Sequence, residues 1–588
     1  MSAGEPKRRA LTLVEALEIG RRPVDDGAPR LNVFLACGFT PLHVQTLLTA
    51  QLRLSRPDHD VHVATGRFGD LIGNIERLQA SSFDSVVAVI EWADLDTRLG
   101  IRSLGGWRAE MMPKILDGVN QAVERVRHCI VQAARRVPIT VSMPTLPLPP
   151  LSWTSPNQAS AFEVQLRESL TVLEAALCKE SRIRIVSAQS LAEISPLSER
   201  FDIKSEIVTG FPYSLSHASA LASHLAALSQ SSSPKKGLIT DLDDTLWAGI
   251  VGDDGVDGIS WDLEHRTHMH GVYQQFVASL ASAGVLVGVA SKNDAAVVDQ
   301  AFERSDLLLT RADIFPMEVH WSPKSESIRR ILSTWNVGAD SIVFVDDSPM
   351  EVAEVKAALP DVECLVFPKN DYQGIWNLLQ HLRGRFGKPI LTEEDTLRLN
   401  SIRESSAWRD AGQGQGASSD DFLRAADGCI TFGYGASHGD ARAFELVNKT
   451  NQFNLNGKRV TEAEWLQSLA DPAGVVVGVS YQDKYGRLGK VAVLLGRTEE
   501  NQLHVTSWVM SCRAFSRRIE HHMLKYLFDK LHVTEVVFGY EGTAKNGPLK
   551  EFLTELLGEA TPGARLSRAS FLANSPALLH QVIESSVE

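Results

Sequence analysis

Residues 236–247 of this 588-residue chain read KGLITDLDDTLW. The branched apolar run ends abruptly at Asp241, Asp243 and Asp244, which are followed by Thr245. Such a run predicts a buried parallel strand whose carboxyl end opens into a site, where open α/β sheets bind ligands. Clustered carboxylates are costly there unless a cation neutralises them, and Mg²⁺ prefers hard oxygen ligands. The stretch therefore predicts a magnesium site.

Two later strand-like runs, at 285–290 and 341–345, also stop at polar residues. These polar residues are Ser291, Lys292, Asn293, Asp346 and Asp347. Between the two runs, Lys324 begins a predicted helix. Because the carboxyl ends of parallel strands meet at one edge of a sheet, we expect these side chains to gather around Asp241.

The words DLDDTLW, VASKND, WSPKSESI and VFVDDSPMEV occur in this order along the chain. Each is common alone, since carboxylates and lysines also occur as solvated loop charges. The ordered set resembles the motifs of the haloacid dehalogenase (HAD) superfamily, and most closely those of the HAD-IIIC branch and of FkbH-type proteins. The resemblance implies a Rossmannoid domain with a parallel sheet that carries out phosphoryl transfer.

The resemblance also implies a role for each residue of the set. Asp241 would be the nucleophile that accepts a phosphoryl group, and Asp243 would protonate the leaving oxygen and then activate water. Thr245 would orient Asp243. Ser291 would hydrogen-bond the phosphoryl oxygens, and Lys324 would neutralise their charge.

The implied metal is Mg²⁺. It would bind between Asp241, the carbonyl of Asp243 and the Asp346/Asp347 pair, and the sequence leaves open which member of the pair is the direct ligand. Further contacts to the substrate are assigned to Lys292 and Asn293. The Gly- and Asp-rich segment 248–261 suits a hairpin or flap over the site.

Residues 1–232 alternate predicted strands and helices, which indicates an α/β domain with a parallel sheet. This region resembles an SGNH-hydrolase-like domain. The first turn offers Thr40 where that family needs a nucleophilic Ser, and no DxxH motif lies near His217. We expect a degenerate domain that is structural or docks a partner; the alternative takes Thr40 and His217 as remnants of a site. His217 is more simply a surface or helix-end histidine.

The phosphatase-like domain is predicted to span 233–390, followed by a helix and linker at 391–425 and a last domain at 426–588. In the last domain, predicted antiparallel strands precede a helix at 519–531, which indicates an α+β fold. Its words RAFELVNKTNQFN and WVMSCRAFSRRIE resemble a GNAT-like acyltransferase domain. Both glycines of that family's pyrophosphate loop are replaced here, by Ser516 and Arg518.

Cys512 lies where a predicted strand meets a helix, close to arginines, and both features lower the pKa of a thiol. It is therefore a candidate acyl-carrying nucleophile, although most single cysteines are inert packing residues. Several neighbours are candidates to bind a phosphopantetheine arm, the alternative being a basic helical turn and a capped turn without a ligand. They are Arg513, Arg517, Arg518, Asn451 and Gln452.

The bulk composition excludes several classes of protein. The net charge of −13 argues against nucleic acid and anionic membrane as partners. The six cysteines show no metal-ligand spacing, which favours reduced thiols in the cytoplasm. No apolar run is long enough to predict a transmembrane helix.

FkbH-type proteins dephosphorylate 1,3-bisphosphoglycerate and load the glyceryl unit as a thioester on an acyl carrier protein. The resemblance implies this activity here, in a polyketide-type pathway. One alternative is a HAD phosphatase for another phosphorylated metabolite, with a C-terminal domain that only binds. The other is a non-enzymatic scaffold that docks a carrier protein.

Overall fold

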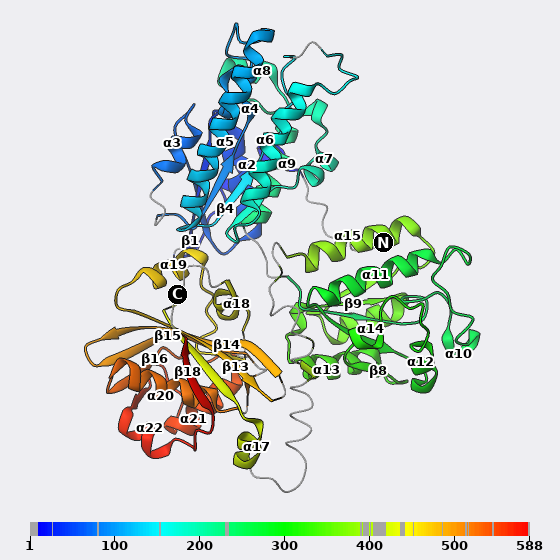
Figure 1. The fold of residues 1–588 in the computed structure, drawn as a ribbon, viewed down its shortest axis with the longest axis vertical. Helices are drawn as coiled ribbons and strands as arrows, with labels where there is room; N and C mark the ends of the chain where they lie inside the picture. Colours follow the sequence, from blue (N-terminus) through cyan, green and yellow to red (C-terminus); the bar gives the residue numbers. More distant parts are fainter. Residues whose placement is uncertain are drawn as a thin grey trace. The chain divides into compact units, whose positions relative to one another are not determined.

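The computed structural model describes most of the chain and forms two compact units. One comprises residues 1–232 with 460–471, and the other residues 233–459 with 472–588. The described residues are 10–25, 27–78, 82–151, 154–229, 234–388, 391, 399, 402–403, 419–435, 441–450, 452–484, 486–511, 514–515, 517–543 and 546–585. Three sheets with accompanying helices make up the α/β architecture that the sequence predicts (Figure 1). The domain boundaries remain predictions.

The first sheet is parallel, with the strand order β2-β1-β3-β4-β5. Its strands are β1 (Arg30–Cys37), β2 (Asp60–Thr65), β3 (Ser85–Val89), β4 (Ile139–Ser142) and β5 (Ile183–Ile185). Its helices are α1 (Leu13–Gly20), α2 (Leu42–Ser55), α3 (Leu71–Glu76), α4 (Trp92–Leu95), α5 (Met112–Ala134), α6 (Ala161–Leu177), α7 (Ala188–Ile194), α8 (Ile203–Thr209) and α9 (Leu215–Ser229). Alternate residues of β1 enter opposite cores: Leu35 packs with α2 and α9, and Ala36 with α5. Burial on both faces explains the unbroken apolar runs.

One boundary in this region differs from the sequence prediction. The apolar run SVVAVIEW at 85–92 predicts a strand over its whole length, but β3 ends at Val89, because a helix starts at Trp92. Asp94 accepts a hydrogen bond from the backbone N–H of Glu91, which caps that helix. Glu91 and Asp94 are thereby placed just beyond the strand end.

The second sheet is also parallel, in the order β10-β9-β6-β7-β8. Its strands are β6 (Gly237–Thr240), β7 (Leu286–Ser291), β8 (Met317–Val319), β9 (Ile342–Asp346) and β10 (Glu363–Val366). Its helices are α10 (Val251–Asp254), α11 (His268–Ser282), α12 (Ala295–Ala301), α13 (Lys324–Trp335), α14 (Pro349–Ala358) and α15 (Tyr372–Phe386). Leu238 packs with α11 and α15, whereas Ile239 packs with α13 and α14. The predicted hairpin or flap contains the helical turn α10, closed by a bridge between Ala248 and Ser260.

The third sheet is mixed, in the order β17-β16-β15-β14-β13-β11-β18, and β12 pairs with β15. Its strands are β11 (Cys429–Tyr434), β12 (Phe453–Asn454), β13 (Gly474–Asp483), β14 (Gly486–Glu499), β15 (Gln502–Met510), β16 (Glu535–Phe538), β17 (Arg565–Ser567) and β18 (Gln581–Ser585). Helices of this part of the sequence are α17 (Ser419–Ala426), α18 (Ala441–Lys449), α19 (Glu462–Ala470), α20 (Ile519–Leu531), α21 (Gly547–Leu557) and α22 (Arg568–Asn574). The predicted helix 519–531 is found with these bounds as α20.

Across the described ranges, no helix combines the length and the apolar character needed to cross a bilayer. Thr40 donates its hydroxyl hydrogen bond to the carbonyl of Thr209, 2.9 Å away. No hydrogen bond among the described residues joins it to His217. The structure therefore gives no support to a remnant site made of this pair.

Of the two interpretations of His217, the surface histidine is wrong, whereas the helix-end position is confirmed, since the residue lies in the first turn of α9. The side chain is fully buried in α9. Its Nε2 lies 2.9 Å from Thr145 Oγ1, and its Nδ1 lies 2.9 Å from Ser195 Oγ. Burial, with a smaller contribution from the charge of Arg200, lowers the pKa of His217 to about 3.

Acid should therefore loosen the packing around α9. The unfolded chain binds a proton at His217 below pH 6.5, whereas the folded chain binds it only near pH 3, so stability falls between these values. At pH 5 the loss is about 2 kcal/mol. We expect hydrogen-exchange protection of α9 peptides, corrected for intrinsic exchange, to fall from pH 7 to pH 5. The fall should be smaller in His217→Gln than in the wild type, and as large as in the wild type in the exposed control His62→Gln. Equal falls in all three proteins would show that protonation of His217 does not cause the loss of protection.

Candidate active site

The sequence-predicted residues of the second sheet meet at its carboxyl edge. Asp241 follows β6 directly, Ser291 is the last residue of β7, and Asp346 is the last residue of β9. Strand β6 lies between β7 and β9, so all three positions are neighbours. Lys324 reaches the same edge from the first turn of α13.

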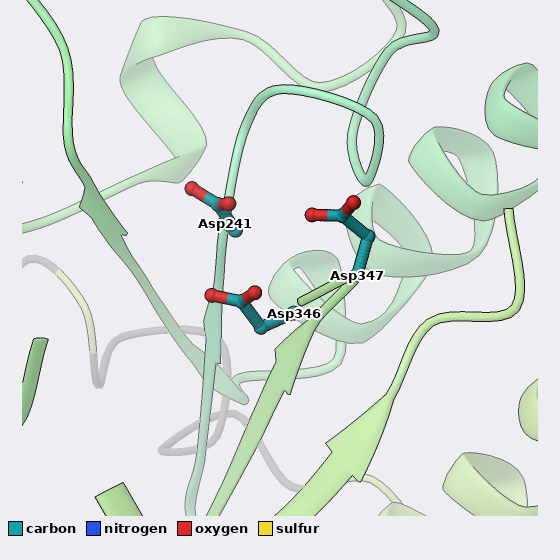
Figure 2. A group of neighbouring side chains, drawn as sticks. All are labelled: Asp241, Asp346 and Asp347. Atoms are coloured by element: carbon teal, nitrogen blue, oxygen red, sulfur yellow. The ribbon is translucent and has the colours of Figure 1, made fainter. Parts of the chain in front are cut away.

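Three carboxylates form a compact cluster at this edge. Asp241, Asp346 and Asp347 each place an oxygen within 4.8 Å of the others, and Figure 2 shows them on adjoining strand ends. Asp241 and Asp346 are buried, with 7% and 0% of their surface exposed. Asp241 Oδ1 is buried and meets no hydrogen-bond partner among the described residues. A hard cation would satisfy this oxygen, and the all-oxygen donor set fits Mg²⁺.

Lys324 is the cation that the chain itself supplies to the cluster. Its Nζ lies 2.7 Å from Asp241 Oδ2 and also contacts Asp346 Oδ2. Only 3% of the side chain is exposed. Burial alone would lower the pKa of Lys324, but the two carboxylates raise it above its usual value. The lysine therefore stays charged in the site.

The pKa values of the two buried carboxyl groups are also raised, which for an acid favours the neutral form. Burial raises the pKa of Asp241, Lys324 lowers it, and the like charge of Asp346 raises it further. The pKa of Asp346 is also raised by burial. One lysine does not compensate the two buried carboxylates that it contacts, so the site has an excess of negative charge that favours a divalent cation.

Asp243 is held apart from the cluster by three donors. Trp247 Nε1 lies 2.9 Å from Asp243 Oδ1, and the backbone N–H of Val251 donates to the same oxygen over 3.1 Å. Asn293 Nδ2 donates to Oδ2 over 2.8 Å. These contacts direct the carboxylate between the flap and β7. Asn293 therefore helps to position Asp243, and its contact with substrate remains a prediction.

The Thr245 hydroxyl has a partner other than Asp243, and its role in orienting Asp243 remains a prediction. The Thr245 hydroxyl accepts a hydrogen bond from the backbone N–H of Asp347, 3.0 Å away. It therefore ties the loop after β6 to the loop after β9. This follows from the pairing of the two strands, which brings the two loops side by side.

Lys369 is a site residue that the sequence reasoning missed. Its Nζ lies 2.7 Å from Asp244 Oδ2 and 2.9 Å from Asp347 Oδ2. It follows β10, the neighbour of β9, so its position at the same edge of the sheet was an available signal. The ammonium fixes one oxygen of Asp347.

Ser291 is buried beside the cluster, as expected from its position at the end of β7. Lys292 points to a different partner: its Nζ lies 2.8 Å from Glu351 Oε1 on α14. The ion pair places Lys292 against the helix that follows β9. Its proposed contact with substrate remains a prediction.

The structure describes only some of the candidate residues of the last domain. Cys512, Arg513 and Asn451 lie outside the described residues. Gln452 is half-buried just before β12, and its role remains a prediction. These positions neither support nor oppose an acyl site.

The predicted phosphate contacts of Arg517 and Arg518 remain predictions, and both side chains have partners within the domain. Arg517 is 2% exposed, lies over the ring of Tyr481 and pairs with Asp483 at 3.4 Å. Arg518 donates to Asp420 Oδ1 over 2.6 Å and to the carbonyl of Ala577 over 2.9 Å. Both guanidinium groups stabilise the domain internally, because burial requires each charge to be paired.

The carboxylate cluster predicts measurable Mg²⁺ binding by the full chain. We expect Asp347→Asn to weaken binding about tenfold or more in isothermal titration with MgCl₂, because one anionic ligand is lost. Asp299→Asn, which alters an exposed carboxylate on α12, should bind as the wild type does. Equal affinity of the Asp347 variant and the wild type would show that the cation is not held by this cluster.

Comparison with models of known families and with curated proteins gives no match. Among solved structures, the chain is similar to the N-terminal part of the protein BF1531 from Bacteroides fragilis, which contains a phosphatase domain and was crystallised with Mg. The identity is 22%, the TM-score is 0.49, and the match covers 65% of this chain and 100% of the other. A similarity at this level carries no argument about activity.

Proposed function

We propose that this chain is a Mg²⁺-dependent phosphoryl-transfer enzyme of the HAD type, with Asp241 as the nucleophile. The observation that carries the proposal is the convergence of Asp241, Asp243, Lys324 and Asp346 at one sheet edge. The cluster unites an anionic nucleophile, a separately held carboxyl group and a buried cation. A structural ion pair alone would not require the unpartnered Asp241 Oδ1.

The chemistry assigned to the residues is a double displacement. A carboxylate oxygen of Asp241 attacks phosphorus, and the bond from phosphorus to the leaving oxygen breaks. Asp243 gives its proton to that oxygen. Asp243 then takes a proton from water, whose oxygen attacks the aspartyl phosphate; phosphate leaves and the Asp241 carboxylate is restored.

Lys324 stabilises the charge that spreads over the phosphoryl oxygens in both steps, because its ammonium is already in place and shielded from water. Asp241, Asp346 and Asp347 would hold Mg²⁺, which supplies further charge neutralisation at the phosphoryl group. The flap that contains α10 lies next to Asp243 through the N–H of Val251, so it limits the size of a substrate.

By the resemblance to FkbH-type proteins, we propose 1,3-bisphosphoglycerate as the substrate and an acyl carrier protein as the partner. A thiolate attacks the carbonyl carbon of the acyl phosphate and displaces inorganic phosphate, and the remaining phosphate ester is hydrolysed by water through Asp241. Cys512 is the candidate thiol on this chain, which would pass the glyceryl unit to the phosphopantetheine arm of the carrier.

A HAD phosphatase with a C-terminal domain that only binds is the second candidate. The internal pairing of Arg517 and Arg518 favours it, since two of the arginines proposed for the phosphopantetheine arm are engaged elsewhere. The two candidates share the chemistry at Asp241 and differ only in the acyl transfer.

The test is to incubate the full chain with Mg²⁺, 1,3-bisphosphoglycerate and a holo carrier protein, and to measure phosphate release and the intact masses of both proteins. We expect a glyceryl adduct on the carrier. Asp241→Asn should release phosphate from the ester at least about 1,000-fold more slowly, because the nucleophile is lost, and Asp299→Asn should match the wild type.

Each contrary outcome has a definite meaning. Phosphate release without an adduct supports the binding-only alternative. Carrier loading that is unchanged in Cys512→Ala removes the thiol relay through that residue. Ester cleavage that is unchanged in Asp241→Asn removes the proposed function itself.

A further inference from the structure

A pocket of about 790 Å³ lies in the first unit, far along the chain from the carboxylate cluster. Its lining comes from loops that follow the carboxyl ends of β1 to β4. The segments are 38–39, 68–72, 91–94 and 146–150, joined by residues from 97–103 and 201–212. Open α/β sheets bind ligands at this edge, and the volume suits a small organic molecule.

The walls of the pocket are mostly apolar. The apolar side chains of the lining include Phe39, Phe68, Trp92, Leu99, Leu148 and Ile203. Phe68 and Ile203 are exposed, with 58% and 57% of their surface accessible, so apolar side chains also form the mouth. An apolar cavity with an apolar mouth favours a ligand that is itself largely apolar.

Two carboxyl groups form the polar floor, and only one of them is available. Glu91 accepts hydrogen bonds from the Thr145 hydroxyl and the Tyr213 hydroxyl, at 2.6 and 2.7 Å, as well as from backbone N–H groups. Asp94 uses Oδ2 to accept from the Glu91 N–H, and its Oδ1 has no hydrogen-bond partner among the described residues. Glu91 is therefore a structural group, whereas Asp94 Oδ1 can bind a ligand.

Gly38 makes room for this carboxyl group. A Cβ atom at position 38 would lie 1.6 Å from Asp94 Oδ1, so any larger residue would displace it. Burial, opposed by the hydrogen bond from Glu91, raises the pKa of Asp94 to about 7. The carboxylic acid form donates to a carbonyl, and the carboxylate accepts from an N–H, so a primary amide satisfies either form.

The charges around the pocket disfavour an anion. Arg102 pairs with Glu206 at 2.9 Å, and its guanidinium also donates to backbone carbonyls of α8. Arg125 is exposed at the lining's edge. The acidic groups Glu91, Asp94 and Glu206 therefore face a ligand without a dedicated buried cation.

We propose that this pocket is a binding site for a neutral, largely apolar molecule that carries an amide group, with Asp94 as its polar anchor. The site binds without cleaving, because His217, the buried histidine of this sheet edge, uses both ring nitrogens on Thr145 and Ser195 and does not line the pocket. The proposal is independent of the chemistry at Asp241.

Isothermal titration of the full chain with octanamide and with octanoate tests the proposal, because the two probes share a carbon chain and differ in charge. We expect octanamide to bind at least tenfold more tightly than octanoate at pH 8. Ala93→Trp, at an exposed position of the lining, should abolish octanamide binding by filling the pocket. The control Ala175→Trp, at an exposed position of α6 outside the lining, should bind as the wild type does.

Asp94→Asn should retain octanamide binding and should reduce the preference over octanoate, because the acidic anchor is lost. Octanoate binding equal to or tighter than octanamide binding in the wild type would overturn the assigned ligand class. Octanamide binding that is unaffected by Ala93→Trp, or no binding of either probe, would overturn the site. Conversion of octanamide to octanoate would show a catalytic pocket and overturn the binding-only role.

Discussion

The second sheet is organised around a buried group of unlike charges: the Lys324 ammonium between the carboxylates of Asp241 and Asp346. Removing these charges from water is costly, and the lysine offsets only part of that cost because the carboxylates outnumber it. Asp347 adds a third carboxylate at the same edge. The excess negative charge and the unpartnered Asp241 oxygen make the site complementary to a divalent cation and then to a phosphoryl group.

The topology explains why this group forms. From β6 the chain passes to β7 on one side, and β9 later pairs with β6 on the other side. Loops that leave neighbouring parallel strands in opposite directions open a crevice between them, at the point where the strand order reverses. Asp241 directly follows β6, Asp346 is the last residue of β9, and Asp347 follows it, so all three border this point. Lys324 needs only the first turn of α13 to reach them.

The strand ends that place the site could be predicted from sequence, because a branched apolar run that stops at polar residues is a local sequence pattern. The strand ends at Asp241, Ser291 and Asp346 follow from that pattern. Partners set by pairing between distant strands could not be predicted: Thr245 bonds the N–H of Asp347, and Lys369 joins Asp244 to Asp347. The burial of His217 was missed because a single polar residue in a helix gives no periodic signal.

The proposed chemistry depends on Asp241 as the phosphoryl acceptor, and a rapid acid quench tests this directly. The full chain is mixed with Mg²⁺ and 1,3-bisphosphoglycerate, quenched within its first turnover, digested with protease and mapped by mass spectrometry. The account predicts one acid-stable phosphoryl group on the peptide that contains Asp241, and its absence in Asp241→Asn. A phosphoryl group on another residue, or turnover in which no phosphopeptide forms at any quench time, would contradict it.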